Sequence, residues 1–387
     1  MWTFIIYGEA GMICLTAFSL LVSLLYFLFL KKIKNGLHSI KGIKSGNAEL
    51  KSVSIIVPFR NESQNIVNCY NSLVNQNYPQ DKFEIIFIDD NSTDDSVHKL
   101  EKILKNQNIK ILKLNNTNIN KAFKKQAVKL GIEKSKGEII VTTDADCTHP
   151  ENWLSKLLSY YDDETALISG PVEFNASNSI FSQLQILEFA GLVLTGAGLI
   201  GSGRPIICNA ANLTFRKNVF NEVGGYDDMM NLSSGDDELL MQKIAAAKKY
   251  KIKFAFDRSA IVRTEANKSL TNFYQQRKRW ASKSLFYKSK LLLINILVIF
   301  LFFLNLLLLP FMAIFINKYF VLLFSFEFFI KMFLEYRIVH FGKKYLFYNL
   351  SMKLFLIAEI VHVPYIIISA LSGIFGNYKW KNREVER

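Results

Sequence analysis

The feature that most constrains this chain is a run of twenty uncharged residues near its amino terminus, Gly11 to Leu30. An α-helix rises ~1.5 Å per residue, so such a run can span the ~30 Å hydrocarbon core of a bilayer. No basic residue precedes it and no small-residue cleavage site follows it, which argues against a cleaved signal peptide. Lys31, Lys32 and Lys34 come directly after it. Because cytoplasmic loops carry the excess of Lys and Arg, the amino terminus is expected outside and the following segment in the cytoplasm.

A second hydrophobic region lies at the other end of the chain. Its first segment, 291–316, is uncharged, whereas two weaker candidate spans at 319–334 and 352–375 contain ionisable side chains. Three crossings after a cytoplasmic domain would leave the basic tail, 379–387, outside, against the charge rule. Either one segment is re-entrant or interfacial, or the tail is an exception to the rule.

The ionisable residues within these candidate spans have two interpretations. Charges inside a membrane mark functional sites by default. However, Glu327 and Lys331 are four residues apart, so they can pair along one helix, and Lys331 can also extend toward the membrane surface. The sequence leaves both interpretations open.

The net charge of +14 is located next to the apolar segments. All of the excess lies in residues 31–51, 263–290, 331–344 and 379–387, and the rest of the chain is slightly acidic. This placement favours membrane anchoring over nucleic-acid binding, so we expect membrane lipids and no nucleic acid as partners. The four Cys residues have no C-x-x-C spacing, which excludes an encoded disulfide framework or zinc site.

Between residues 52 and 262 the pattern changes to short β-branched runs separated by helix-period segments. Strands are expected at Val53–Val57, Glu84–Ile88, Ile109–Leu114 and Glu138–Thr143. Repeated β-α-β alternation predicts an α/β fold, with a mostly parallel sheet covered by helices on both faces. The predicted organisation is a membrane helix (1–30), a basic linker (31–51), the α/β domain (52–262), interfacial amphipathic helices (263–290), a membrane region of about three segments (291–378) and a basic tail (379–387).

Gly196, Gly198 and Gly201 spell G-x-G-x-x-G, the pattern of dinucleotide-binding loops. A true fingerprint follows the first strand and opens the first helix of a βαβ unit. This one instead follows an apolar, helix-like run in the middle of the chain, so we interpret it as a flexible loop that does not bind NAD.

Acidic residues follow two of the expected strands. Asp89 and Asp90 come after the second strand, and Asp144 and Asp146 come after the fourth. Ligands of parallel sheets bind at the carboxyl ends of the strands. Two carboxylates spaced i,i+2 at a strand end can both turn toward one hard cation such as Mg²⁺. Phosphate and water oxygens then complete the coordination shell of the cation.

Two further motifs lie nearer the carboxyl end. Asp236, Asp237 and Glu238 precede an apolar helix-like stretch, where they can serve as charges at a helix amino terminus or supply a general base. Gln276–Trp280 reads Q-x-x-R-W and comes just before a membrane segment, a place that also suits an interfacial helix.

Taken together, the order and spacing of these motifs resemble the family 2 glycosyltransferases, specifically their membrane-integrated branch of polysaccharide and lipid-linked glycan synthases. The resemblance covers nearly the whole chain and implies a GT-A nucleotide-sugar-binding domain. The matching segments are Ser54–Glu62, Gln76–Pro79, Glu84–Asp94, the D-x-D of Thr143–Asp146, Asp236-Asp237 in the place of Glu-Asp, and Q-x-x-R-W.

The resemblance implies a donor site for a nucleotide sugar, expected to be a UDP-sugar, with Mg²⁺ or Mn²⁺ as cofactor. Asp89 and Asp90 would hold the uracil and ribose, Asp144 would touch the ribose or sugar and contribute to the metal site, and Asp146 would ligate the metal on the diphosphate. The other donor-binding residues implied are Pro58, Arg60 and Glu62 in the nucleoside pocket, Lys121 near the phosphates in a loop that departs from the usual glycine pattern, and Gln276 and Arg279 on the pyrophosphate.

The resemblance also implies an acceptor side and a mechanism. Trp280 would stack on the acceptor sugar, and Asp236 would lie beside it. Cys208 and Asn209 lie in the place of the acceptor loop, where Asn209 replaces the usual Gly. Asp237 would be the general base of a single in-line displacement, so an α-linked UDP donor would give a β-glycoside.

Several functions stay open. A processive synthase at the plasma (inner) membrane is favoured by Q-x-x-R-W, and a single-addition enzyme acting on a glycan or lipid-linked acceptor is favoured by the small membrane region and the lack of an F-x-V-T-type segment. A catalytically inactive, membrane-tethered nucleotide-sugar-binding protein would need Asp237 or the D-x-D to be missing, and both are present.

Overall fold

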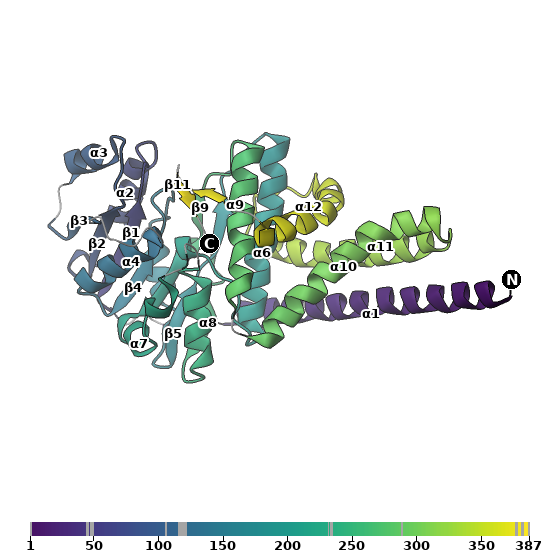
Figure 1. The fold of residues 1–387 in the computed structure, drawn as a ribbon. Helices are drawn as coiled ribbons and strands as arrows, with labels where there is room; N and C mark the ends of the chain where they lie inside the picture. The colour runs from purple at the N-terminus through teal and green to yellow at the C-terminus, as the bar shows by residue number, and fades with distance from the viewer. Residues whose placement is uncertain are drawn as a thin grey trace.

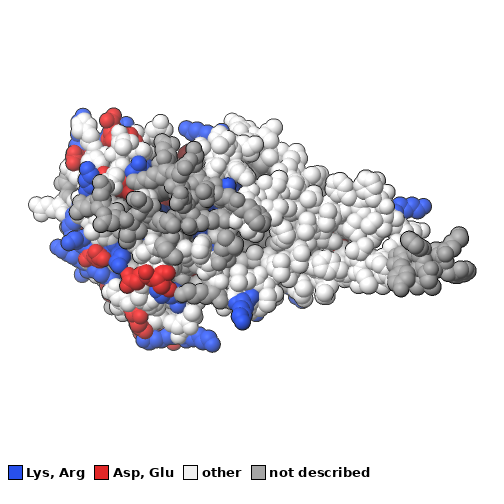
Figure 2. Space-filling model, viewed as in Figure 1, with Lys and Arg blue, Asp and Glu red and all other residues white. Residues whose placement is uncertain are grey.

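The protein consists of an α/β domain from which a set of long helices projects (Figure 1). This computed structural model describes residues 2–43, 46, 50–104, 107–114, 122–230, 232, 235–287, 289–375, 378–380 and 383–385. On the face shown in Figure 2, charged side chains gather over the α/β domain. The projecting part is almost bare of them, as expected for a surface that faces lipid.

The α/β domain is built on one seven-stranded sheet with the order β3-β2-β1-β4-β7-β5-β8. Only β7 runs antiparallel to its neighbours, so the prediction of a mostly parallel sheet is confirmed. The strands are β1 (Val53–Phe59), β2 (Phe83–Asp89), β3 (Ile109–Lys113), β4 (Ile139–Thr142), β5 (Thr165–Ser169), β7 (Leu213–Arg216) and β8 (Lys251–Phe254). Two small sheets pair β6 (Val172–Phe174) with β9 (Val262–Thr264), and β10 (Tyr378–Trp380) with β11 (Arg383–Val385).

Alternation along β1 gives the sheet its two covered faces. Ile55 and Val57 pack with the helices of one side, and Ile56 packs with the other side in a core that continues into the membrane helices. This confirms helices on both faces. The first face is covered by α2 (Ile66–Val74), α3 (Ser96–Ile103) and α5 (Trp153–Leu158), and the second by α4 (Phe123–Lys134), with α7 (Lys217–Glu222) and α8 (Glu238–Ala246) further along the chain.

The expectation of a flexible loop at the G-x-G-x-x-G motif is wrong. All three glycines belong to helix α6 (Ile180–Gly201), and Gly198 and Gly201 let it pack directly on α1 (Trp2–Lys41), whereas Gly196 faces the Ile207 carbonyl. A Cβ on Gly198 would lie 2.5 Å from the carbonyl oxygen of Ile33, and one on Gly201 would lie 2.2 Å from that of Gly36. The glycines are therefore required by a close approach of two backbones.

The long helices outside the sheet domain are α1, α10 (Lys290–Phe315), α11 (Phe320–Tyr345) and α12 (Phe355–Phe375). Within the described residues, α6, α10, α12 and α1 from Ala10 onward are long and apolar enough to cross a membrane. In Figure 1, α1, α10 and α11 run side by side away from the domain, whereas α12 stays beside α6 and α9 (Leu270–Ser282). Over half of the apolar stretch of α6 is buried within the protein, which marks α6 as part of the domain.

The charges inside these helices form two separate networks, so the suggested Glu327–Lys331 pair is wrong. Glu327 accepts hydrogen bonds from Ser19 of α1 (2.7 Å) and Asn305 of α10 (2.7 Å). Lys331 instead pairs with Glu359 of α12 and with Glu335, at 3.1 Å from the latter. Each network joins different helices, which fixes their relative positions.

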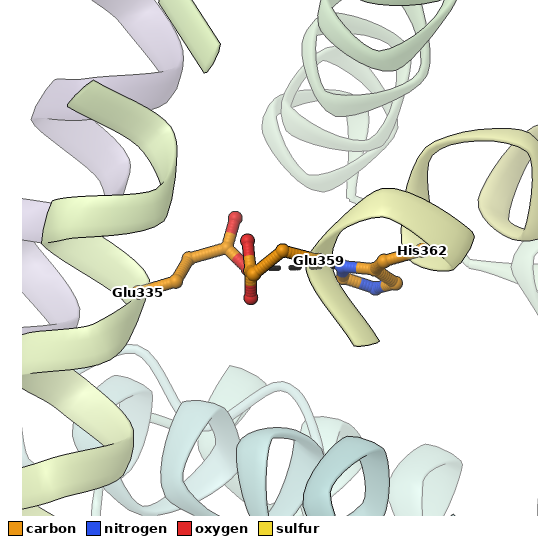
Figure 3. A group of neighbouring side chains, drawn as sticks. All are labelled: Glu335, Glu359 and His362. Atoms are coloured by element: carbon orange, nitrogen blue, oxygen red, sulfur yellow. Dashed lines mark ion pairs between the residues drawn. The ribbon is translucent and has the colours of Figure 1, made fainter. Parts of the chain in front are cut away.

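The second network includes a group of two carboxylates and an imidazole that could ligate a metal ion (Figure 3). His362 Nδ1 lies 3.6 Å from Glu335, whose other oxygen accepts a 2.7 Å hydrogen bond from Tyr26. Because the buried Lys331 ammonium already pairs with both carboxylates, a metal would have to displace it. We therefore interpret the group as a clasp between α1, α11 and α12.

Candidate active site

The loops that follow β1 and β2 are fastened to each other at the carboxyl edge of the sheet. Arg60, just after β1, donates from Nη1 to the carbonyl oxygens of Asp90 and Asn91, both at 2.7 Å. Asn61 and Asn91 have positive φ values, 52° and 54°, so both loops turn sharply at the ends of their strands. The backbone N–H of Glu62 donates to Ser96 Oγ at 2.8 Å. This crosslinking gives the expected nucleoside pocket rigid walls.

The acids expected on the nucleoside side are buried in this pair of loops. Asp89 ends β2 and accepts a hydrogen bond from the Ser92 backbone at 2.8 Å, and Asp90 follows it. Pro58 is paired in register with Ile88 in the neighbouring strand. The predicted donor residues of β1 and β2 are thus brought together at one edge.

The D-x-D turn follows β4, the neighbour of β1 on its other side. Its base is held by His149, whose two ring nitrogens lie 2.8 Å from Thr143 Oγ1 and 2.9 Å from Ser72 Oγ. Burial lowers the pKa of His149 to about 3, so the ring stays neutral and serves as a hydrogen-bonding strut. Asp146 is exposed, while Asp144 is half-buried.

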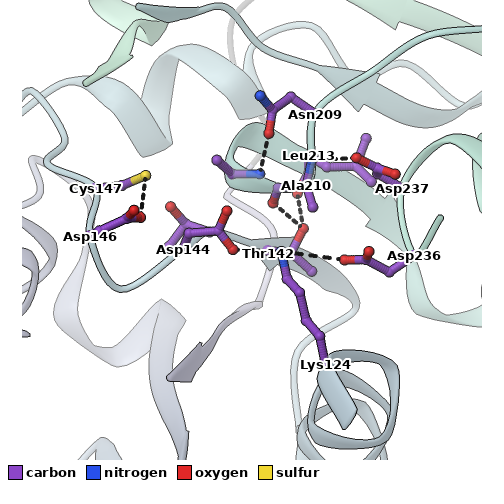
Figure 4. Close-up of polar contacts among 12 residues, drawn as sticks. Lys124, Thr142, Asp144, Asp146, Cys147, Asn209, Ala210, Leu213, Asp236 and Asp237 are labelled. Atoms are coloured by element: carbon purple, nitrogen blue, oxygen red, sulfur yellow. Dashed lines mark hydrogen bonds and ion pairs between the residues drawn. The ribbon is translucent and has the colours of Figure 1, made fainter. Parts of the chain in front are cut away.

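A lysine that the motifs did not indicate connects the two acidic clusters (Figure 4). Lys124 Nζ lies 2.6 Å from Asp144 and 3.5 Å from Asp236. Burial alone would lower the pKa of Lys124, but the charges of these carboxylates outweigh it and raise that pKa, so the ammonium stays charged. Lys121, the expected phosphate contact, lies outside the described residues. The lysine that the structure places at the D-x-D comes three positions later.

Asp237 is held in a fixed orientation at the start of α8. Its Oδ1 accepts a 2.7 Å hydrogen bond from the Glu238 backbone, and its Oδ2 accepts one of 3.1 Å from the Ala210 backbone. Burial opposes ionisation, but Lys283 and these backbone donors lower the pKa of Asp237, so it is ionised at neutral pH. The interpretation of Asp237 as a charge at a helix amino terminus is therefore correct, because Asp237 caps α8. A carboxylate has about four lone-pair sites, so two are left for a further donor.

Asp236 and Asp237 face different partners. Asp236 turns toward Lys124 and the D-x-D, whereas Asp237 turns toward the acceptor loop (Figure 4). Ala210 ends that loop and is itself held by Thr142 Oγ1, which donates to its carbonyl oxygen at 2.9 Å. This division of contacts agrees with the ~100° between successive side chains at a helix start.

Lys283 is a second basic residue that the sequence motifs missed. It is buried just after α9 and lies 3.7 Å from Asp237 and 3.1 Å from Glu238. These carboxylates outweigh the effect of burial and raise the pKa of Lys283. Tyr287 completes the group by donating to Glu238 at 2.7 Å. The signal in the sequence was periodicity, because Arg279 and Lys283 are one helical turn apart.

The residues of the Q-x-x-R-W motif have two kinds of surroundings: some are bonded to neighbouring elements and anchor α9, and others lie toward the candidate site. Gln276 accepts hydrogen bonds from Asn267, at 2.9 Å, and from Arg277. Arg277, which the motif treats as variable, is buried and makes a two-pronged ion pair with Glu188 of α6. Arg277 and its pair therefore anchor the motif helix.

Arg279 and Trp280 lie toward the site end of α9. Arg279 Nε is buried and has no hydrogen-bond partner among the described residues, and its charge acts on Lys283. The Trp280 ring centroid is 6.1 Å from that of Phe189. An arginine with an unsatisfied buried donor next to a lysine is suited to an anionic ligand.

The acceptor loop lies against the same group. The Asn209 side chain accepts a 3.0 Å hydrogen bond from the Ala211 backbone and so shapes the loop itself. Cys208 is half-buried, and burial together with the neighbouring Asp237 raises the pKa of its thiol. The thiol is therefore neutral beside the candidate base.

Residues 54–224, which supply the strand ends, the D-x-D and the acceptor loop, match the family model described as Glycosyl transferase family 2. This part of the chain belongs to that family. The matched region ends before Asp237 and Q-x-x-R-W, which the structure nevertheless brings to the same site.

Known relatives support the same activity class. The chain is 28% identical to the glycosyltransferase AglE of Haloferax volcanii over 54% of its own length and 66% of that protein. It is 23% identical to a poly-beta-1,6-N-acetyl-D-glucosamine synthase of Staphylococcus epidermidis over 67% of its length and 61% of the relative. The matches thus span less than two thirds of these relatives. Both relatives are glycosyltransferases by name.

A solved structure supports the fold. The mannosyltransferase PcManGT of Pyrobaculum calidifontis, in complex with GDP-Man and Mn²⁺, superimposes with a TM-score of 0.63 at 16% identity. The match covers 93% of this chain and 99% of that one. The GT-A fold expected from the motifs is thereby confirmed.

Proposed function

We propose that the protein transfers a sugar from a UDP-sugar to a glycan or lipid-linked acceptor at the cytoplasmic surface of the plasma (inner) membrane, with inversion at the anomeric carbon. The observation that carries this proposal is the convergence of three groups on one place. These are the D-x-D acids, the Asp236–Asp237 pair and the Arg279–Lys283 pair. They supply metal ligands, a base and cations for a leaving diphosphate.

The D-x-D residues suit a hard divalent cation. Asp144 and Asp146 offer carboxylate oxygens, the ligand type that Mg²⁺ and Mn²⁺ prefer, on one turn at the edge of the sheet. A bound ion would neutralise charge on the donor diphosphate. Lys124 engages one oxygen of Asp144 at 2.6 Å.

The protein's own residues account for the transfer step. The acceptor hydroxyl attacks the anomeric carbon while the bond from that carbon to the diphosphate oxygen breaks. Asp237, ionised and held by two backbone donors, takes the hydroxyl proton. Arg279 and Lys283 stabilise the charge that grows on the leaving group. A single displacement of this kind inverts the configuration, so an α-linked donor gives a β-linked product.

A specific observation favours single addition over extrusion of a polymer. The space between α1, α10 and α11 is filled by buried side chains. These include Tyr26, Phe302, Phe303 and Lys331, and Tyr26 stacks on Phe302 with ring centroids 4.1 Å apart. A glycan cannot pass through a close-packed interior. We therefore propose that the product stays on the side where it is made.

The test is an assay of the purified full chain in detergent with radiolabelled UDP-glucose, UDP-GlcNAc or GDP-mannose and Mg²⁺ or Mn²⁺. We expect turnover with a UDP-sugar, loss of turnover on chelation, and a product of one added sugar. Asp146→Asn should abolish metal-dependent turnover and leave the protein folded, because it removes one hard ligand. Undiminished turnover of Asp146→Asn would overturn the metal site, activity with GDP-mannose alone would overturn the donor, and long products would overturn single addition.

A further inference from the structure

A groove separate from the candidate active site lies where α1 leaves the apolar segment. It has a volume of about 410 Å³ and is formed between the side of α1 and the end of α6. Lys31, Lys32, Asn35 and Ser39 line it from α1, and Ser202 lines it from α6. Leu28, one turn earlier on α1, lines its apolar end and is 51% exposed. The groove therefore joins a polar wall to a surface that faces lipid.

The cationic side chains of this groove lack acidic partners. Within the described part of the chain, no carboxylate pairs with Lys31 or Lys32. Arg204, two residues beyond Ser202, is close enough to Lys32 for their like charges to repel. Such a cluster is stabilised by an anion brought from outside the chain.

The end of α6 does not explain this concentration of charge. Its last carbonyls already accept hydrogen bonds from backbone N–H groups, from Ser202 to Gly198 at 2.9 Å, and from Arg204 to Leu199 at 2.9 Å. The left-handed Gly203, with φ of 72°, closes this cap. The lysines are therefore not needed as hydrogen-bond donors to the helix end.

We propose that this groove binds the phosphate of a membrane lipid, with the lysines, Asn35 and Ser39 around the phosphate oxygens and the acyl or prenyl chain along Leu28. Lipid phosphates lie at the depth where an apolar helix segment passes into its flanking lysines. Asparagine and serine add hydrogen-bond donors that a purely electrostatic patch lacks. This site goes beyond the transfer reaction, because none of its lining residues contributes to the donor or base groups.

The groove is also connected to the acceptor loop. Only five residues separate Ser202 from Cys208, and they begin at the groove wall. A lipid phosphate in the groove would therefore hold the base of this loop in place. The chemistry fits two sources, an anionic phospholipid of the bilayer or a polyprenyl phosphate.

The experiment measures lipid bound to the full chain in phosphatidylcholine nanodiscs, by native mass spectrometry, as phosphatidylglycerol or a polyprenyl monophosphate is titrated. We expect Lys31→Gln/Lys32→Gln to weaken binding of the retained lipid by at least about 25-fold, since each surface lysine contributes about 5-fold. Lys34→Gln is the matched control, because Lys34 has the same charge at the same depth but does not line the groove. Its effect should be less than about 2-fold, against the roughly 5-fold expected for each groove lysine alone.

A second variant tests shape without altering charge. Ser39→Phe fills the groove and should also release the lipid. Retention of phosphatidylglycerol identifies a bilayer lipid as the ligand, and selective retention of polyprenyl phosphate identifies an acceptor-type lipid. The proposal is overturned if Lys34→Gln weakens binding as much as the Lys31/Lys32 variant, if Ser39→Phe binds lipid normally, or if inorganic phosphate alone displaces the lipid at equal concentration.

Discussion

Asp237 and Asp236 are neighbours in the chain, but their different contacts predict different roles in the reaction. We predict that Asp237→Asn lowers kcat by a factor of roughly 10²–10⁴, the usual contribution of a general base, while donor binding changes little. Asp236→Asn should be milder, because Asp236 contacts Lys124 and not the acceptor loop. Kinetics and calorimetry with the nucleotide diphosphate separate the two effects. A loss of nucleotide affinity as large as the loss of turnover, or a more damaging Asp236→Asn, would show that the base is misassigned.

Lys125 predicts a dependence of stability on pH. It is buried beside Lys124 and donates to the carbonyl oxygens of Met229 (3.0 Å) and Leu232 (2.7 Å), and burial lowers its pKa to about 8. Between this value and about 10.5, the ordinary lysine value, the unfolded chain binds more protons than the folded one. The contribution of Lys125 to the free energy of unfolding should therefore rise with pH across that window.

The check compares the wild type with Lys125→Met, which cannot titrate, by thermal unfolding in detergent at pH 7.5, 9 and 10. The difference in stability between the two should shift in favour of the wild type as the pH rises. A difference that stays constant, or that moves toward the variant, would contradict the lowered pKa.

At the scale of single residues, the sequence predicts the positions of the acids better than those of the basic residues that contact them. Asp144 and Asp146 could be placed because they directly follow a buried strand, and such positions meet at one edge of a parallel sheet. The partners of Lys124 and Arg277 are distant in the sequence, so no local spacing predicts these contacts. For Lys283 the only local signal is its spacing of one helical turn from Arg279. Lys121, expected near the donor phosphates, lies outside the described residues, so that role stays a prediction.

Among the elements, the contact between α1 and α6 is the one most exposed to substitution. Gly198→Ala would place a Cβ 2.5 Å from the Ile33 carbonyl oxygen, and we predict a loss of stability of about 1–3 kcal/mol from overpacking. Gly191→Ala in the same helix meets nothing within 4 Å and should be neutral or stabilising by up to about 1 kcal/mol. Thermal unfolding of the purified variants checks both. Equal behaviour of the two would contradict the packing.

The elements show why part of the fold could be predicted. Strands β1 to β4 match the expected runs to within two residues at each end, and β1, β2 and β4 are buried on both faces along almost all of their length. No expectation was formed for β5, β7 and β8, which are four or five residues long and pair with partners distant in sequence. The glycines of α6 resemble loop residues until α1, more than 150 positions earlier, is brought against them.

For the whole molecule, the arrangement of the helices offers an answer to the charge conflict left by the sequence. α12 is apolar enough to span, but it packs against α9, while the charges that make α11 less apolar are paired with other helices. If α10 and α11 cross while α12 lies along the surface, the basic tail returns to the cytoplasm in agreement with the charge rule. We predict that Lys318→Cys, in the turn between α10 and α11, reacts with an impermeant maleimide from outside intact cells. Lys353→Cys, before α12, and Arg387→Cys, at the end of the tail, should react only after permeabilisation.

A cysteine-free background is needed for this measurement, because Cys14, Cys69, Cys147 and Cys208 are all unpaired. Labelling of Arg387→Cys but not Lys353→Cys from outside would mean that α12 crosses the membrane. Labelling of Lys353→Cys from outside would reverse the orientation of the domain, and with it the use of cytoplasmic nucleotide sugars.

The continuity of α1 has a mechanical consequence. Its 40 residues form one helix about 60 Å long, whose first half lies among the membrane helices and whose last turns are locked against α6. A continuous helix of this kind would hold the domain at a fixed height and tilt relative to the helices that α1 packs against. If α1 spans the bilayer, we expect the domain to work at one height above it, and an acceptor to be selected by whether its terminal hydroxyl reaches that height. We therefore expect acceptors to be selected by their length as well as by the residues of the sugar pocket.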